Sequence, residues 1–185
     1  MKLIISPSTD PYFNLALEQY IFDEMDRSHE YFMLWQNDNC IIVGVYQNTI
    51  NEIKQDVVKE RNIKVVRRLS GGGAVYEDMG NLSFTYVTDQ KDKKAVIDFS
   101  VFLNPVASAL AKLGVAAEVN GRNDITIDGK KFSGNAQYIK QGRVMHHGTM
   151  LFDCDLSVVG ACLNVSKEKM AAKGVQSVAS RVTNI

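Results

Sequence analysis

The sequence has little proline, little cysteine and no excess charge of either sign. Its 185 residues include 21 basic and 21 acidic side chains, and this balance argues against a general nucleic-acid binder, which carries a basic excess. Only three prolines and no low-complexity tract argue against long linkers and disorder. No segment approaches the roughly 18 apolar residues of a membrane span, and residues 1–6 are too short for the apolar region of a signal peptide.

The three cysteines are odd in number and lack the spacing of a metal site. They are Cys40, Cys154 and Cys162, and they fit a reduced cytoplasm better than a disulfide framework. Hydrophobic residues make up 45% of the chain and charged residues 23%, which is ordinary for a soluble globular protein. The length predicts one domain, residues 1–185, with a substantial core.

Capping residues and apolar patterns predict the elements of the first half. Asp10 suits an N-cap and Pro11 the first helical position, which predicts a helix over residues 11–26. An apolar stripe predicts a second helix over residues 50–61. Strands are expected at residues 3–6, 31–35, 40–45 and 63–68, with a turn at 37–39, and residues 75–76 are expected to pair with 82–87 across a turn at 77–81.

The second half is predicted to hold a long helix followed by a strand-rich region. The helix covers residues 99–113 and ends at Gly114. Asp128-Gly129 and Gln141-Gly142 are typical hairpin dipeptides. Strands are expected at 116–119, 124–127, 131–140 and 143–152, and helices at 156–163 and 167–172. This order predicts an α/β fold of the α+β type, with a mixed, largely antiparallel sheet flanked by helices, and not the strict βαβ alternation of a doubly wound fold.

The segment from Arg67 to Tyr76 is the most informative in the chain. Its three consecutive glycines, Gly71–Gly73, remove every Cβ, so the backbone can adopt positive φ and approach a ligand closely. Consecutive exposed N–H groups form a concavity for anions, and Arg67 and Arg68 can add forked donors for carboxylate or phosphate. The alternative is a glycine-rich hairpin turn with two solvated arginines.

Four further polar segments stand out, at residues 121–124, 128–136, 146–149 and 172–184. Each has an ordinary interpretation: Asp124 as a turn residue, Lys131 as a solvated hairpin lysine, and His146 and His147 as surface residues of a strand. The run from Ser133 to Ala136, however, has poor β propensity for a strand interior. A glycine inside such a strand often marks the close approach of a ligand or of another backbone.

Several common sites are disfavoured by the residues themselves. No lysine follows the glycines, which disfavours a phosphate-binding P-loop, and strand-like residues follow them where a dinucleotide fingerprint needs a helix. His146 and His147 are adjacent on an expected strand and so point to opposite faces, which disfavours one zinc ion held by both. The Gly-x-Ser-x-Gly pattern of many serine hydrolases is absent.

Six spaced motifs together resemble the lipoate–protein ligase A family, and they span essentially the whole chain in the family's order. The motifs are Arg67-Arg68-x-Ser70-Gly71-Gly72-Gly73-Ala74-Val75, Asp78-x-Gly80-Asn81, Gly121-Arg122-Asn123-Asp124, Lys131-x-Ser133-Gly134-x-Ala136, His146-His147-Gly148-Thr149, and Lys173-Gly174 with Ser177-Val178 and Ser180-Arg181-Val182. Six motifs in this spacing are far more specific than the glycine loop alone.

The resemblance implies a catalytic domain of the biotin/lipoate ligase type, related in fold to class II aminoacyl-tRNA synthetases. It implies two half-reactions that use ATP and Mg²⁺: lipoate and ATP give lipoyl-AMP and pyrophosphate, and a lysine of a carrier domain then attacks the adenylate. The implied partners are the lipoyl domains of 2-oxoacid dehydrogenase E2 subunits and the glycine-cleavage H protein, in a salvage route of protein lipoylation in the cytoplasm.

The resemblance also assigns catalytic and metal-binding roles. Lys131 matches the family's key lysine, which is expected to bridge the acyl carbonyl and the phosphate. Asp124 matches a position expected to hold Mg²⁺, with Asn123 orienting the same centre. The apolar dithiolane tail needs a tunnel, for which Leu15, Val43 and Val75 are expected to supply walls. The residues expected to bind lipoyl-AMP or ATP are Arg68, Ser70, Gly71, Gly72, Gly73, Ala74, Val75, Asn81, Asn123, Asp124, Ser133, Ala136, His147, Gly148, Thr149, Lys173, Gly174, Ser180 and Arg181.

Two loops are expected to contact the adenylate. By the resemblance, Ser70–Val75 lies along the acyl-adenylate with Arg68 on the phosphate side. His147, Gly148 and Thr149 are expected in the wall of the same site, and residues 173–182 resemble the segment that covers the nucleotide.

Ligases of this family continue well beyond the length of this chain, completing the catalytic domain and adding a small C-terminal domain. Residues 1–185 are therefore expected to form an incomplete catalytic large domain, either of a shortened ligase or of a split ligase whose partner chain supplies the rest. Three alternatives stay open: an octanoyl- or lipoyl-transferase working through an acyl-cysteine, a transferase using preformed lipoyl-AMP, and a non-catalytic lipoate-binding fragment. Cys154 and Cys162 are expected to be buried structural residues.

Overall fold

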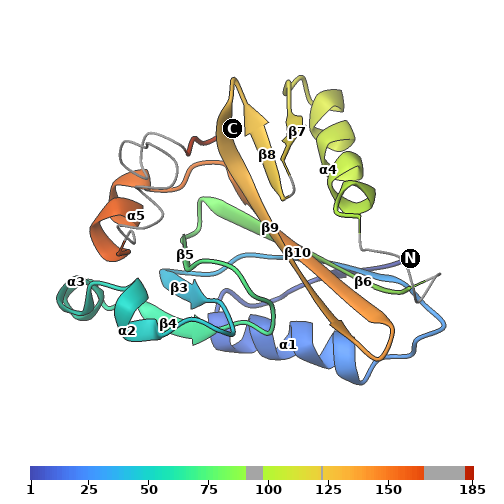
Figure 1. The fold of residues 1–185 in the computed structure, drawn as a ribbon, viewed down its shortest axis with the longest axis horizontal. Coiled ribbons are helices and arrows are strands. Elements are labelled where there is room, and N and C mark those ends of the chain that lie inside the picture. Colours follow the sequence, from blue (N-terminus) through green and yellow to red (C-terminus); the bar gives the residue numbers. More distant parts are fainter. Residues whose placement is uncertain (91–97, 122, 165–181) are drawn as a thin grey trace.

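The strands form two separate sheets (Figure 1). The computed structural model describes residues 1–90, 98–121, 123–164 and 182–185. The strands are β1 (Lys2–Ile5), β2 (Tyr31–Trp35), β3 (Cys40–Val43), β4 (Lys64–Arg67), β5 (Val75–Glu77), β6 (Asn81–Asp89), β7 (Glu118–Asn120), β8 (Asp124–Ile127), β9 (Lys130–Lys140) and β10 (Arg143–Leu151). The larger sheet has seven strands in the order β1-β2-β6-β10-β9-β8-β7, and the smaller has three in the order β4-β3-β5.

Most neighbouring strands run antiparallel. Pairing is parallel between β1 and β2 and between β3 and β4, and the other described pairs are antiparallel. The predicted mixed, largely antiparallel sheet flanked by helices is confirmed. Strand polarity alone does not separate the two sheets, however, and the sequence did not predict that the strands would divide.

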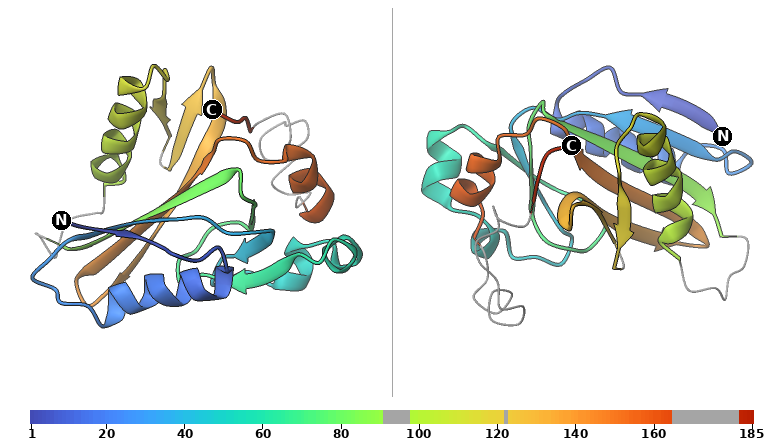
Figure 2. Two further views of the ribbon diagram at one scale, coloured as in Figure 1. Left: turned by 180° about the vertical axis from the view of Figure 1, so that it is seen from behind. Right: turned by 90° about the horizontal axis from the view of Figure 1, so that it is seen from above.

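Helices cover both faces of the larger sheet (Figures 1 and 2). The helices are α1 (Pro11–Asp23), α2 (Thr49–Glu52), α3 (Gln55–Glu60), α4 (Ser100–Lys112) and α5 (Leu156–Cys162). α1 packs beneath both sheets, α4 packs on the opposite face of the larger sheet, and α5 packs on the smaller sheet. Within the described residues, no helix is long and apolar enough to cross a membrane.

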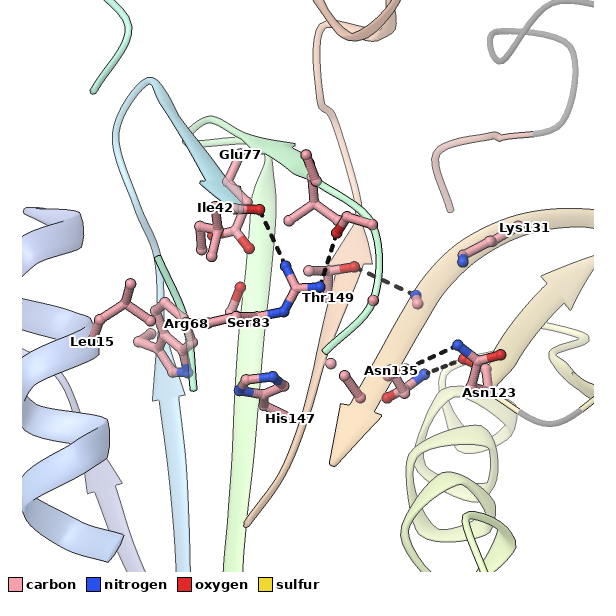
Figure 3. A pocket seen from close by; sticks show the side chains of 18 residues that line it. Leu15, Ile42, Arg68, Glu77, Ser83, Asn123, Lys131, Asn135, His147 and Thr149 are labelled. Atoms are coloured by element: carbon pink, nitrogen blue, oxygen red, sulfur yellow. Dashed lines mark hydrogen bonds between the residues drawn. The ribbon is translucent and has the colours of Figure 1, made fainter. Parts of the chain in front are cut away.

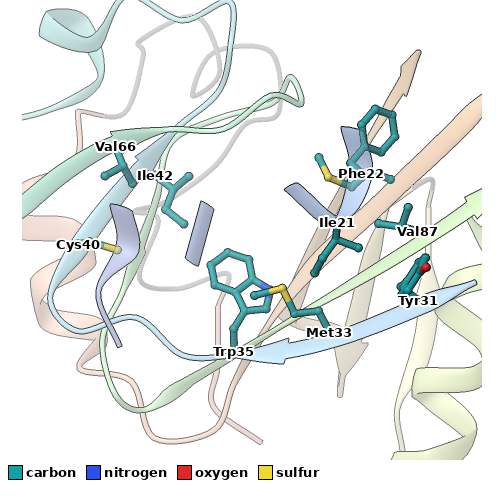
Figure 4. Close-up of a cluster of buried hydrophobic side chains, with 10 residues drawn as sticks. Ile21, Phe22, Tyr31, Met33, Trp35, Cys40, Ile42, Val66 and Val87 are labelled. Carbon is teal, nitrogen blue, oxygen red and sulfur yellow. The ribbon is translucent and has the colours of Figure 1, made fainter. Parts of the chain in front are cut away.

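The core divides into three clusters, one of which joins the two sheets (Figure 4). In that cluster, Ile21 and Phe22 of α1 pack with Met33 and Trp35 of β2 and with Ile42 of β3. Because α1 covers strands of both sheets, it fixes the position of the smaller sheet against the larger one. The space between the two sheets above α1 is where the candidate site lies.

Several predicted local signals are confirmed. The Asp10 side chain accepts a 3.0 Å hydrogen bond from the Tyr12 N–H, and Pro11 opens α1, which ends at residue 23 rather than 26. Both predicted hairpin turns have positive φ at each central residue, 50° and 73° at Asp128-Gly129 and 52° and 75° at Gln141-Gly142. These are the values that a type I′ hairpin requires.

The predicted pairing of residues 75–76 with 82–87 is wrong. β5 pairs with β3 in the smaller sheet, whereas β6 pairs with β2 and β10 in the larger one. The turn at 77–81 carries the chain from the smaller sheet to the larger one, and the Gly80 carbonyl within it accepts from the Phe152 and Asp153 N–H groups. The turn at 37–39 likewise leads from β2 to β3 in different sheets and forms no hairpin.

The predicted single helix over 50–61 is also wrong, since it breaks into α2 and α3. Ile53 is extended, with φ −124° and ψ 149°, and forms a bridge to Leu163. The Lys54 N–H donates to the Cys162 carbonyl at 2.8 Å. Pairing with the end of α5 thus replaces helical hydrogen bonds at residues 53–54. The predicted helix at 167–172 lies outside the described residues.

Candidate functional site

A cavity of about 210 Å³ opens between the two sheets beside α1 (Figure 3). Many residues expected to bind substrate line it, and they come from the glycine loop, from β9 and β10, and from the turn before β8. The expected residues that line the cavity are Arg68, Gly72, Gly73, Ala74, Val75, Asn123, Lys131, Ala136, His147, Gly148 and Thr149. Motifs separated along the chain are therefore brought together around one space.

The two arginines before the glycine loop differ in burial: Arg67 is exposed, whereas Arg68 points into the protein. Arg67 Nη1 donates to the Gly44 and Gln47 carbonyls at 2.7 and 2.9 Å, which fastens the loop after β3. Arg68 is 8% exposed, and its Nη2 donates to the Gly71 and Gly73 carbonyls at 2.8 Å each. The interpretation as a turn with two solvated arginines is therefore wrong for Arg68, which braces the glycine loop from inside, while Arg67 is exposed.

The charged end of the cavity is formed by β8 and β9. Lys131 Nζ lies 2.7 Å from Asp124 Oδ1, and both side chains are 37% exposed. A register shift at Ile125/Thr126 inserts one extra residue into β9, since Ile125 pairs with Ser133 but Thr126 pairs with Lys131. Such a bulge re-aims side chains, and here it brings Lys131 onto the same face as Gly134.

Gly134 gives the Lys131 side chain its room. A Cβ at position 134 would lie 2.8 Å from Lys131 Nζ and 2.9 Å from Cε, so the lysine occupies the space that a side chain would fill. The Gly134 N–H donates to Thr149 Oγ1 at 3.4 Å (Figure 3). Asn123 Nδ2 donates to the Asn135 carbonyl at 3.0 Å, which ties the turn before β8 to β9.

The opposite end of the cavity is apolar. Leu15 of α1, Trp35, Ile42 and Val75 line it, and Figure 3 places Leu15 across the cavity from Lys131. Val43 does not line it, so that part of the predicted tunnel is wrong: the side chain packs instead on the other face of β3, in the cluster with α5.

Several expected residues lie next to the cavity without lining it. Ser70 and Ser133 are each 1% exposed and hydrogen-bonded to neighbouring side chains, and Asn81 is fully buried and donates to Ser83. Gly71 belongs to the loop backbone, and Asp124 reaches the site through its ion pair with Lys131. Lys173, Gly174, Ser180 and Arg181 lie outside the described residues, as does Arg122.

The sequence did not single out Glu18, Trp35, Ile42, Glu77 or Ser83. Glu18 contacts His147, and the other four line the cavity. Ile42 and Trp35 lie on strands and look like ordinary core residues, so only packing shows that they border a cavity. The two carboxylates, Glu18 and Glu77, are both buried. Because buried acids need partners, a glutamate at a position expected to be buried is the signal that could have indicated them.

Glu77 is a buried carboxyl in the cavity wall. It is 1% exposed, and Asn37 Nδ2 donates to its Oε2 at 2.9 Å. Burial raises the pKa of Glu77 from 4.5 to about 7 despite hydrogen bonds from Asn37 and Ser83. The wall therefore holds an acid that keeps its proton in the folded state up to neutral pH.

Glu77→Gln is expected to become more stable relative to the wild type as the pH rises. The unfolded chain ionises Glu77 near pH 4.5, whereas the folded chain ionises it near pH 7, so the wild type loses unfolding free energy across that window. The neutral amide escapes this loss, which is at most ~3 kcal/mol. Urea unfolding of both proteins at about pH 5 and about pH 8 measures it. A stability difference that is the same at both pH values would contradict the assignment.

The three cysteines and His146 do not line the cavity. Cys40, Cys154 and Cys162 are buried free thiols, and burial raises the pKa of each. His146 stacks on Phe102 with ring centroids 4.6 Å apart, and burial lowers its pKa to about 3. Its ring faces α4 while that of His147 faces the cavity, so the prediction of opposite faces is confirmed. Among the described residues, no group of three or more His, Cys, Asp or Glu is arranged to hold a metal.

Comparison with known proteins gives a consistent match. Residues 10–185 match the family described as "Lipoyl protein ligase A/B catalytic domain". The chain is 48% identical over 176 residues to the lipoate-protein ligase LplJ of Bacillus subtilis, which covers 95% of this chain and 53% of that protein. It spans about half the length of the curated relatives that it matches.

Solved structures agree with the sequence match. A bi-partite lipoate protein ligase of Thermoplasma acidophilum, described with its E2 lipoyl domain, superposes with a TM-score of 0.89 at 29% identity, covering 100% of this chain and 74% of that one. A lipoate-protein ligase A bound with ATP gives a TM-score of 0.86 at 27% identity, covering 99% of this chain and 75% of that one.

Proposed function

The chain belongs to the lipoyl protein ligase A/B catalytic domain family, and from that premise we propose that it activates lipoate with ATP and transfers the lipoyl group to a protein lysine. In the first step a lipoate carboxylate oxygen attacks the α-phosphorus of ATP and pyrophosphate leaves. In the second the carrier lysine nitrogen attacks the acyl carbon, AMP leaves and the nitrogen loses a proton. Residues 1–185 would supply catalytic residues for both steps.

The observation that carries the proposal is the polarity of the cavity. Its α1 end is apolar, with Leu15 and Trp35, and suits a dithiolane tail, whereas its far end presents Lys131. Joining a carboxylate to a phosphate brings like charges together, so a fixed cation at that end lowers the barrier. Only 37% exposed, the Lys131 ammonium sits where such repulsion would arise.

The glycine loop would form the long wall beside the acyl-adenylate. Gly72 has φ 100° and is exposed, so its backbone can approach a ligand without a Cβ in the way. Arg68 donates inward to the loop carbonyls, and we infer that it shapes the loop that meets the phosphate side. His147, Gly148 and Thr149 would close the wall on the β10 side.

Asp124 fits a magnesium site to which the protein supplies few ligands. Mg²⁺ usually keeps several waters and binds one or two carboxylates plus substrate phosphates. Asp124 offers one carboxylate at the rim, 37% exposed and next to Lys131. Bound there with ATP, Mg²⁺ would supply charge neutralisation of the phosphates.

The partners and the compartment follow from the same proposal. A structurally similar ligase is described with an E2 lipoyl domain, which supports lipoyl domains as acceptors, including those of 2-oxoacid dehydrogenase E2 subunits and the H protein of glycine cleavage. That ligase is called bi-partite, which supports a second chain as a further partner. Three buried free thiols suit the reducing cytoplasm.

Mass spectrometry of a lipoyl domain incubated with this chain, ATP, Mg²⁺ and lipoate tests the proposal directly. We expect the mass of one lipoyl group to be added only when ATP and lipoate are both present. A parallel reaction with premade lipoyl-AMP separates the steps, and lipoate-dependent ATP–pyrophosphate exchange reports activation alone. Absence of exchange together with absence of transfer from lipoyl-AMP would leave only a lipoate-binding role and would refute an enzymatic function.

The same assay excludes or supports an acyl-cysteine route. A thioester route needs an activated thiolate in the site, but the three thiols are buried, have raised pKa values and do not line the cavity. We therefore expect each cysteine-to-alanine variant to transfer the lipoyl group at a rate within about twofold of the wild type per folded molecule, because no thiol takes part. A variant that folds but cannot transfer would favour the thioester route.

A further inference from the structure

A continuous chain of buried hydrogen bonds runs from β2 to the glycine loop, and two of its members, Trp35 and His147, line the cavity. Trp35 Nε1 donates to Thr85 Oγ1 at 3.0 Å, and Thr85 Oγ1 donates to Glu18 Oε1 at 2.6 Å. His147 Nδ1 lies 2.8 Å from the same Glu18 oxygen, and His147 Nε2 lies 2.5 Å from Ser70 Oγ. All five side chains are more than nine-tenths buried.

One arrangement of protons satisfies all of these contacts. Glu18 as a carboxylate only accepts, so the Nδ1 of His147 carries the proton of that contact. Nε2 of the neutral ring is then left to accept from the Ser70 hydroxyl. The Ser70 oxygen in turn accepts from Arg68 Nε at 3.0 Å, and its own proton goes to the 2.5 Å contact with His147 in preference to the 3.5 Å contact with the Gly71 carbonyl.

Arg68 connects this chain of hydrogen bonds to the glycine loop. Its Nη1 donates to the Ile42 carbonyl at 3.1 Å, while its Nη2 donates to the carbonyls of Gly71 and Gly73. The guanidinium is planar, so holding Nε against Ser70 also fixes the direction of both Nη groups. The loop carbonyls are thus oriented through a group that His147 and Glu18 hold in place.

The acid, imidazole and hydroxyl are ordered as in a catalytic triad, but the surroundings do not suit a nucleophile. Ser70 is 1% exposed and does not line the cavity. Its oxygen already accepts from Arg68, which withdraws a lone pair from any attack. The arrangement therefore orients groups and does not attack substrate.

We propose that Glu18 is a positioning residue that acts through His147 and Ser70 to hold Arg68, and with it the glycine loop, in the shape that binds the acyl-adenylate. This inference rests on the proposed function, because it names the loop as the substrate-binding element. Glu18 lies 129 residues from His147 in the chain, and His147 lies 77 residues from Ser70. Loss of the carboxylate should lower the affinity for substrate clearly, while it lowers the stability of the fold only a little.

Binding of a non-hydrolysable lipoyl-adenylate analogue to Glu18→Gln tests the proposal. Gln keeps the shape but replaces a charged acceptor with a weaker neutral one, so we expect affinity to fall about tenfold with little loss of stability. Ser70→Ala should give a similar loss, and the double variant should lose no more than either single variant, because both break one chain of contacts. Arg143→Met is the matched control: Arg143 is buried at the far end of β10 and donates to the Phe22 and Met25 carbonyls. It should lower Tm without changing affinity.

Nitrogen-15 NMR of the histidine rings gives a readout that does not depend on substrate. The chain has only three histidines, so the His147 signals can be assigned. We expect a neutral ring protonated at Nδ1 in the wild type and a changed Nε2 signal in Ser70→Ala. A different tautomer in the wild type, or fully additive losses in the double variant, would overturn the proposal. The expected tautomer in a wild type that binds no analogue would instead refute the proposed function.

Discussion

Lys131→Ala should abolish formation of the acyl-adenylate while leaving the fold intact. The ammonium is the cation at the charged end of the cavity, and removing one preorganised group of this kind costs at least about a hundredfold in rate. Among the described residues that line the cavity, the other permanent cation is Arg68, whose guanidinium donates to the glycine-loop carbonyls instead. Lipoate-dependent ATP–pyrophosphate exchange measures the loss.

The fold should survive because Lys131 contributes little to stability. Its ion pair with Asp124 is 37% exposed on both sides, and exposed pairs contribute at most about 1 kcal/mol. Its backbone carbonyl, which accepts from the Thr183 N–H at 2.9 Å, is unaffected by the substitution. Thermal unfolding of the variant should therefore match that of the wild type within a few degrees.

Lys130→Ala is the matched control for this experiment. Lys130 is the neighbouring lysine on the same strand, exposed at the hairpin turn and absent from the cavity wall. It removes an equal charge from nearly the same place, so its exchange rate should stay close to that of the wild type. Equal losses in the two variants would indicate a general charge effect, and an active Lys131→Ala protein would refute the role assigned to Lys131.

Gly44→Ala should destabilise the protein and disturb the glycine loop together. A Cβ at position 44 would lie 2.2 Å from the Gly72 carbonyl oxygen and 3.3 Å from Arg68 Nη2. The nearest atom is backbone, so the loop itself must move. Overpacking of this kind should lower the free energy of unfolding by about 2 kcal/mol. Urea unfolding measures that loss.

Substrate binding should also fall in Gly44→Ala, by more than tenfold for a lipoyl-adenylate analogue, since the displaced loop lies along the cavity. Gly160→Ala is the control. Gly160 lies inside α5, and outside the backbone of its own helix no atom of the described residues lies within 4 Å of its added Cβ, so alanine should stabilise the helix by up to about 1 kcal/mol. Destabilisation without any change in binding would contradict close contact between Gly44 and the loop.

Local signals in the sequence predicted most elements because they act over a few residues. The Asp10 cap, the hairpin dipeptides and the stop at Gly114 each depend on neighbouring backbone groups, and each is found where expected. The failures occur where a distant segment intervenes. Ile53 leaves its helix to pair with Leu163, and β5 joins β3 instead of β6.

By itself, then, the sequence determined most of the helices and strands, the glycine loop and the motif order that marks the family. Only the tertiary structure decided which strands share a sheet, that Arg68 faces inward, and that Glu18, His147 and Ser70 meet. The physical reason is that the signals in the sequence act over only a few neighbouring residues. Apolar periodicity and turn residues say which face of an element is buried, but they do not say against which partner. The contact of Ser70 with His147 spans 77 positions of the chain, and that of Glu18 with His147 spans 129. Such contacts are fixed only when the packed layers bring those faces together.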